Sequence, residues 1–281
     1  MNDRISIHIC TKDRHSELGL LFQSLRSQTI QDWDLILLDE SQTPITMCYF
    51  LSYLINRLKL ENHKIKLIRN DTSQGVCYAR NQLIENDTFK NKYTLRLDDD
   101  VVLEPNYIFK LRQVITEKFY DMASGVVPPI SNPNLEREIR FVKPIINKHE
   151  FDKKGKLVKQ NDDCGYCYIE KEILPSHQFR TNCLYKSEIN NKVKYPQNLT
   201  FTGFREEGFF SIKAILEGYK IGINTGAVCY HFSCPSGGVR FTPEQYKQNV
   251  NLDNETFTKW LKQMFDKHGD FFEEYNKKVV K

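Results

Sequence analysis

The chain has 281 residues, 40% hydrophobic and 27% charged, proportions typical of a globular protein with a full core. No apolar run approaches the ~20 residues that a membrane-spanning helix needs, and Met1–Arg4 lacks the apolar core of a signal peptide. We therefore expect a cytoplasmic location, where the eight cysteines are reduced thiols. The net charge of +4 suits an anionic ligand and does not call for nucleic acid.

Short apolar runs alternate with helical patterns along the N-terminal part of the chain. The runs predicted to form strands are Ile5–Cys10, Asp34–Leu38, Lys64–Ile68 and Tyr93–Leu97. The patterns predicted to form helices are Ser16–Gln28, Ile45–Leu58 and Gly75–Ile84. Because strands that alternate with helices are typical of βαβ units, this order predicts an α/β fold with a mostly parallel sheet flanked by helices.

The alternation stops after Pro128, where prolines and charges replace any clear period. The later elements predicted are a strand at Phe179–Tyr185, a helix at Phe204–Glu217, a strand at Lys220–His231 and one or two amphipathic helices at Thr242–Lys281. We therefore expect an α/β domain over residues 1–241, interrupted by an irregular insertion or lid at about 130–178. A C-terminal helical extension over residues 242–281 would follow it.

Three adjacent carboxylates, Asp98, Asp99 and Asp100, follow the apolar run Tyr93–Leu97. In an extended strand, Asp98 and Asp100 share one face and Asp99 points to the other. Three like charges at a strand end repel one another, and a hard divalent cation with oxygen ligands relieves that repulsion. The alternative is a solvated acidic turn. Ligands of such sheets bind beyond the carboxyl ends of the strands, which favours a functional site.

Four motifs follow one another along the chain. They are Ser27–Asp39, Gly75–Asn81, Leu97–Asp100 with Pro105 after it, and Arg205–Glu207 followed by a helix that ends at Glu217–Ile221. In this order and spacing they resemble the family 2 glycosyltransferases, which have the GT-A (Rossmann-like) fold. The resemblance covers Ile5 to about His231, apart from the insertion. One departure is Glu207, because the family commonly has aspartate there.

The resemblance implies a site for a nucleotide-sugar donor. The residues that it points to are Thr11, Asp13, Arg14, Asp39, Arg80, Asp98 and Asp99. Asp13 and Asp39 would accept hydrogen bonds from the nucleotide, and Arg80 would supply a fork of donors to the diphosphate or the base. The alternatives are a helix cap for Asp13, a turn for Asp39 and a surface ion pair for Arg80.

The resemblance also implies a metal site and a base. Asp100 is the first choice for a ligand of Mn²⁺ or Mg²⁺, with Asp98 and His231 beside it. An imidazole ligand suits Mn²⁺ better than Mg²⁺, although a lone histidine is more often packed or exposed. Glu207 would act as the general base, and its alternative role is to stabilise the start of a helix.

The activity implied is that of an inverting, metal-dependent glycosyltransferase in cell-surface glycan assembly. The expected partners are a nucleotide-sugar donor, a UDP-sugar by default, and a glycan or lipid-linked acceptor. Lysines and aromatic residues in the tail from Thr242 would allow peripheral contact with the inner face of the membrane. The alternative for this tail is a packed helix with Trp260, Leu261, Met264 and Phe265 on its buried stripe.

Two other functions fit parts of the chain. A sugar-phosphate nucleotidyltransferase should carry a glycine-rich loop after the first strand, and Thr11–His15 has no glycine. A zinc-binding interaction module could use Cys164 and Cys167 with Cys183, His177 or His149. A second cluster for such a module is Cys229, His231 and Cys234, but neither set has a regular four-ligand spacing.

Overall fold

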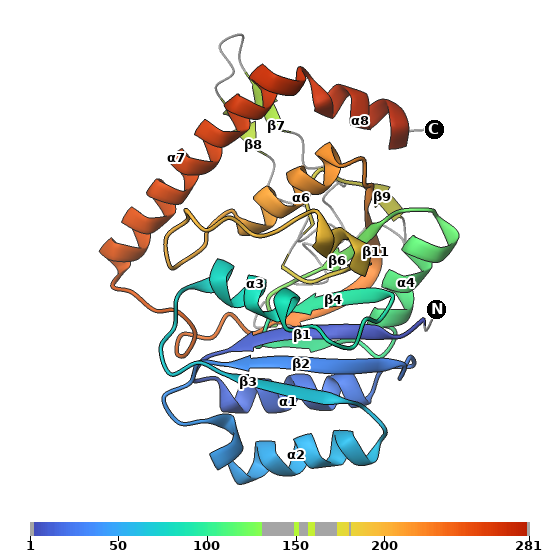
Figure 1. Cartoon of the computed structure of the whole chain (residues 1–281), viewed down its shortest axis with the longest axis vertical. Helices are drawn as coiled ribbons and strands as arrows, with labels where there is room; N and C mark the ends of the chain where they lie inside the picture. Colours follow the sequence, from blue (N-terminus) through green and yellow to red (C-terminus); the bar gives the residue numbers. More distant parts are fainter. Residues whose placement is uncertain (1–2, 131–148, 152–156, 161–172, 180, 280–281) are drawn as a thin grey trace.

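The computed structural model describes residues 3–130, 149–151, 157–160, 173–179 and 181–279 (Figure 1). Within these ranges a nine-stranded mixed sheet has the order β3-β2-β1-β4-β10-β6-β11-β5, with β9 paired to β11. The strands are β1 Ile5–Thr11, β2 Trp33–Asp39, β3 Ile65–Arg69, β4 Tyr93–Leu97, β5 Val101–Leu103, β6 Met122–Val126, β9 Ile173–Pro175, β10 Cys183–Lys186 and β11 Ile221–His231. A separate hairpin pairs β7 (His149–Phe151) with β8 (Leu157–Gln160).

The N-terminal half of the sheet is parallel, as predicted. Strand β1 pairs in parallel with β2 and β4, and β2 pairs in parallel with β3. Strand β10 then runs antiparallel to both β4 and β6, so the sheet changes direction next to β4. The carboxyl ends of β1, β2 and β4 therefore lie at one edge of the sheet, where the sequence places its polar clusters.

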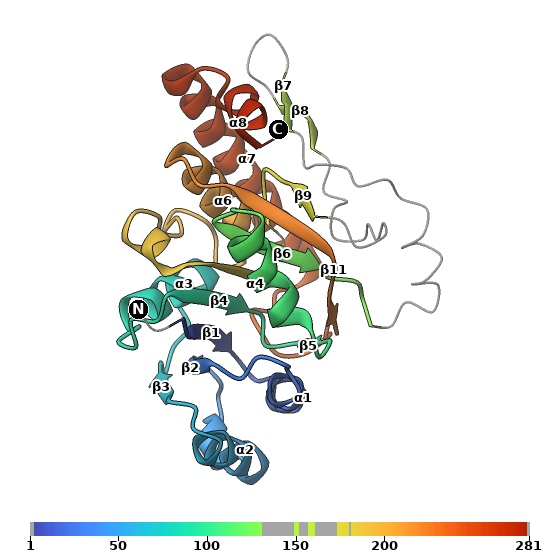
Figure 2. The same ribbon diagram turned by 90° about the vertical axis from the view of Figure 1, so that its right-hand side faces the viewer.

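Helices cover both faces of the sheet. Their bounds are α1 His15–Arg26, α2 Tyr49–Leu60, α3 Val76–Glu85, α4 Tyr107–Glu117, α6 Glu206–Leu216, α7 Pro243–His268 and α8 Phe271–Val279, with 3-10 turns η1 at Ile45–Met47 and η3 at Ser187–Asn191. Figure 2 shows α1 and α4 on one side of the sheet and α3 and α6 on the other. The prediction of an α/β fold flanked by helices and followed by C-terminal helices is confirmed.

Side chains alternate between two cores along the central strands, as the two-residue period of a strand requires. On β4, Leu95 and Leu97 join the core beneath α1 and α4. On β10, Cys183 and Tyr185 join the core on the opposite face, which α6 covers. Arg96 of β4 faces this second side, because it lies between Leu95 and Leu97 in the strand.

The C-terminal helices pack on this second core. Thr242 caps α7 through a capping box with Gln245. Phe257 and Leu261 are buried against α6, and Trp260, Met264 and Phe265 pack partly buried around them. The apolar stripe of the tail is therefore packed against the domain, as the packed-helix alternative expects. Among the described helices, none combines the length and the hydropathy needed to cross a bilayer.

Two predicted elements differ from the structure at their starts. The strand predicted from Phe179 begins at Cys183, because the Phe179 N–H donates to Ser211 Oγ and the Asn182 side chain accepts from the Asp98 N–H. The helix predicted to begin at Ile45 starts later, because Ile45–Met47 form a 3-10 turn and α2 begins at Tyr49.

A buried carboxylate on α7 holds the loop that precedes α6. Asp253 is 1% exposed, and it accepts hydrogen bonds from the Thr200 N–H at 2.7 Å, the Thr200 hydroxyl at 2.8 Å and the Phe204 N–H at 2.8 Å. Asp253→Ala removes these acceptors, so we expect the free energy of unfolding in urea to fall by about 1–3 kcal/mol. The exposed Asp266 of the same helix provides the control, because Asp266→Ala should change stability by less than about 0.5 kcal/mol. Equal stability of both variants would contradict this role.

Candidate active site

The polar strand ends meet around a cavity of about 440 Å³ at the carboxyl edge of the sheet. Its lining includes Thr11, Arg14, Arg80, Asp98, Asp99, Asp100 and His231. The chain passes from β4 through the acidic triplet directly into β5, and His231 at the end of β11 lies opposite Val101 of β5. The predicted acidic and histidine side chains are therefore brought together from distant segments.

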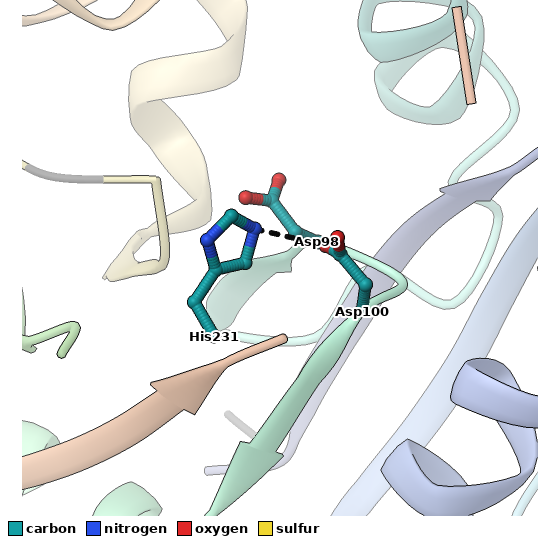
Figure 3. A group of neighbouring side chains, drawn as sticks. All are labelled: Asp98, Asp100 and His231. Atoms are coloured by element: carbon teal, nitrogen blue, oxygen red, sulfur yellow. Dashed lines mark hydrogen bonds and ion pairs between the residues drawn. The ribbon is translucent and has the colours of Figure 1, made fainter. Parts of the chain in front are cut away.

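Three of these side chains form a group with the chemistry of a metal site (Figure 3). One ligand atom from each of Asp98, Asp100 and His231 lies within 4.8 Å of the others. His231 Nε2 is 3.1 Å from Asp100 Oδ1, and Ser233 Oγ lies 3.1 Å from His231 Nδ1. Ligands at ~2.1 Å from one octahedral ion lie ~3–4 Å apart, so this group is close to the required size.

Asp100 gives the strongest support for a cation-binding role. Its side chain is 2% exposed, and its Oδ2 has no hydrogen-bond partner among the described residues. Arg14 Nη1 lies 3.0 Å away, an ion pair without hydrogen-bonding geometry. A buried carboxylate oxygen with no donor is costly, and a divalent ion would satisfy it. The donor set of two carboxylates and one imidazole therefore fits Mn²⁺, and its oxygens fit Mg²⁺.

The neighbouring basic side chains fix the charge of this group. Arg80 donates to the Leu97 carbonyl at 3.0 Å and to Asp98 Oδ1. Burial alone would raise the pKa of Asp98, but Arg80 and Arg96 outweigh it and hold that pKa below its usual range. Burial also lowers the pKa of His231, but the hydrogen bond and charge of Asp100 raise it overall.

Asp99 lies outside the metal group, in the turn between β4 and β5, so its direction does not follow from a strand period. It accepts from the Thr11 hydroxyl at 2.8 Å and from Arg14 Nη1 at 2.7 Å. Burial raises the pKa of Asp99 to about 6, against the opposing charge of Arg14. Thr11 and Arg14 thus hold Asp99 while also lining the cavity.

Asp13 and Asp39 organise the loops beside the cavity. Asp13 accepts from the Gln42 N–H at 2.7 Å. Asp39 is buried and accepts from the Ser41 and Ile45 N–H groups, each at 2.9 Å. The Asp39 contacts stabilise the turn into η1, which matches the turn alternative and explains why the predicted helix starts late. Contact of Asp13 and Asp39 with a nucleotide stays a prediction.

A second cavity of about 460 Å³ adjoins the first and shares Val76, Arg80, Asp98, Thr202 and Tyr246 with it. The start of α6 contributes Glu206 and Glu207 to its lining. The Glu206 side chain is 4% exposed and paired with Arg96, whereas the Glu207 side chain is 21% exposed. Glu207 is therefore the more accessible carboxylate of the pair, at the position predicted for a base.

Comparison with known proteins gives the family. Residues 6–177, more than half of the chain, match the profile described as "Glycosyl transferase family 2". The chain belongs to this family. The family assignment favours a glycosyltransferase over the nucleotidyltransferase alternative.

A curated relative, an "Uncharacterized glycosyltransferase" of Haemophilus influenzae, is 29% identical over 114 residues, which is 40% of this chain and 35% of the relative. Solved structures share the fold at 15% sequence identity. GalNAc-T7 with UDP, GalNAc and Mn²⁺ gives a TM-score of 0.60 over 81% of this chain and 43% of that chain. S. aureus TarS 1-349 in complex with UDP-GlcNAc gives 0.57 over 89% and 65%. The chain spans less than two thirds of each of these proteins.

Sequence reasoning did not identify Arg96, Tyr246 or the loop Ser233–Arg240 as parts of the glycosyltransferase site. Cys234, Gly238 and Arg240 of this loop line the first cavity, and the Gly238 N–H donates to the Lys12 carbonyl. Arg96 carried a detectable signal, because a charged residue between two leucines of a buried strand requires a partner. Tyr246 had no such signal, since its position depends on how α7 packs.

The zinc hypothesis finds no support in the described residues. Cys164 and Cys167 lie outside them, and the metal group found within them is Asp98, Asp100 and His231. His177 instead stacks on Phe272, with ring centroids 4.3 Å apart.

Proposed function

We propose that this family 2 glycosyltransferase moves a sugar from a nucleoside diphosphate to an acceptor hydroxyl, with inversion at the anomeric carbon. The supporting observation is the pair of adjoining cavities. One contains the metal group, the other contains Glu207, and Asp98 and Arg80 line both. A donor in the first cavity and an acceptor in the second would meet at this shared wall.

The donor would lie with its diphosphate at the metal group. Asp98, Asp100 and His231 would hold Mn²⁺ or Mg²⁺, which supplies Lewis-acid stabilisation of the departing diphosphate. Arg14 and Arg80 line the same cavity and add positive charge beside the phosphates. The proposed donor is a UDP-sugar, because neighbouring structures hold UDP, UDP-GlcNAc and Mn²⁺. Asp13 and Asp39 would order the loops around its nucleotide.

The acceptor would lie over the start of α6. Glu207 would take the proton of the acceptor hydroxyl as that oxygen attacks the anomeric carbon opposite the leaving diphosphate. Displacement from that side inverts the anomeric configuration. The proposed acceptor is a glycan or a lipid-linked sugar in cell-surface assembly, reached at the inner face of the membrane.

A ligand screen tests the donor assignment. UDP and a panel of UDP-sugars are expected to raise the melting temperature in the presence of Mn²⁺, because a ligand that binds only the native state stabilises it. At a concentration of 100 Kd the stabilisation is about 2.7 kcal/mol. Other nucleoside diphosphates serve as controls for the base. No shift with any nucleoside diphosphate, with or without Mn²⁺, would contradict the proposed function.

A further inference from the structure

The centre of strand β4 carries a buried charge that the proposed mechanism has not used. Arg96 is 2% exposed and faces α6, whereas its neighbours Leu95 and Leu97 face the other core. A central strand is an unfavourable place for a guanidinium unless carboxylates compensate for it. The carboxylates that compensate for Arg96 are both at the start of α6.

Arg96 contacts both glutamates of the motif Arg205–Glu207. Its Nη1 donates to Glu206 Oε2 at 2.8 Å, and its Nη2 donates to Glu206 Oε1. The same Nη2 also donates to Glu207 Oε1 at 3.3 Å. The bidentate pair with buried Glu206 already occupies the fork of Arg96, so the contact with Glu207 is additional to that pair.

Aromatic side chains fix the plane of the guanidinium. The Phe179 and Tyr195 ring centroids lie 5.4 and 5.5 Å from Arg96 Cζ. Tyr195 is itself anchored, because its backbone N–H and carbonyl each form a 3.0 Å hydrogen bond with the Asn81 side chain. Arg96 therefore presents Nη2 to Glu207 from a rigid position.

The backbone of Glu207 is fixed as well. Arg205, just before α6, has the left-handed φ of 79°, and its Nε donates to Asn254 Oδ1 at 2.7 Å. With the helix start held in this way, the remaining freedom of Glu207 lies in its side chain. A glutamate has one more rotatable bond than the aspartate common in the family, so it needs a further restraint to aim its carboxylate.

We propose that Arg96 is a positioning residue for Glu207, an inference that rests on the proposed function. Glu206 anchors the guanidinium, and the guanidinium holds Glu207 Oε1. The second oxygen of Glu207 is then directed to the acceptor hydroxyl. Arg96 affects sugar transfer through Glu207, and it takes no part in donor binding, which occurs in the first cavity.

A double-mutant cycle tests this role. Arg96→Lys keeps the charge but loses the fork, and misplacement of a reacting group by about 1 Å costs about 10²-fold. We expect kcat for UDP release from a panel of UDP-sugars to fall about 10–10²-fold, with the Kd for UDP in Mn²⁺ unchanged. In a Glu207→Gln background, Arg96→Lys should cost less than about twofold, because its effect passes through Glu207.

The matched control is Arg4, a partly exposed arginine whose Nη2 and Nε donate to buried Asp34 at 2.7 and 3.1 Å. Arg4→Lys should lower stability and leave kcat unchanged. If Arg96→Lys does not fold, Glu206→Gln replaces it in the same cycle, because it removes the anchor of Arg96.

Two results would overturn the positioning role while the proposed function stands. They are equal losses of kcat in both backgrounds, and weakened UDP binding in Arg96→Lys. A parent protein that neither binds UDP nor releases it from any UDP-sugar would refute the proposed function itself, and with it the role of Arg96.

Discussion

Replacing Asp100 with alanine is expected to abolish sugar transfer and to remove the Mn²⁺ dependence of UDP binding. Asp100 is buried, contacts His231 and has an oxygen without a hydrogen bond, so its loss takes the central carboxylate from the metal group. The loss of Mn²⁺ affinity should exceed the roughly 10–100-fold that removal of a supporting partner costs. Titration calorimetry of UDP with and without Mn²⁺ measures it.

A second aspartate–histidine pair provides the control for this experiment. Asp87 Oδ2 lies 3.0 Å from His8 Nε2, and neither residue lines the two cavities of the site. Asp87→Ala should therefore lower stability and leave Mn²⁺-dependent UDP binding intact. A folded Asp100→Ala variant that still binds UDP in a Mn²⁺-dependent manner would show that the buried Asp100 carboxylate has a structural role and holds no metal ion.

The parallel half of the fold and the place of the metal group were predictable because both depend on local patterns. The apolar run Tyr93–Leu97 predicts β4, and the acidic triplet directly follows it. Parallel strands put their carboxyl ends at one edge, so Thr11 and Asp98 must approach each other. The resemblance to the family added His231, whose position depends on β11 pairing with β5.

Pairings between distant residues account for most of what was not predicted. Arg96 and Glu206 are 110 positions apart, and no period in either segment indicates that they meet. The order in which β10, β6 and β11 pair is likewise a property of the whole sheet. The late start of α2 follows from the Asp39 carboxylate, which binds the Ile45 N–H and replaces a local helical preference with a turn.

The sharpest prediction concerns the proposed general base, Glu207. Glu207→Gln preserves size and packing but cannot accept a proton at neutral pH, so kcat should fall about 10²–10⁴-fold. The Kd for UDP in Mn²⁺ should stay unchanged, because the base acts on the acceptor. Single-turnover measurement of sugar transfer, alongside calorimetry of UDP binding, separates the two effects.

Glu206→Gln is the matched control, since it makes the same chemical change at the neighbouring residue. Glu206 is paired with Arg96 and nearly inaccessible, so its substitution should lower kcat less than that of Glu207 does. A reversed order, with Glu206→Gln inactive and Glu207→Gln active, would place the base one residue earlier and require Arg96 to release it. Full activity of both variants would exclude the start of α6 as the source of the base, because α6 presents only these two carboxylates to the cavity among the residues described.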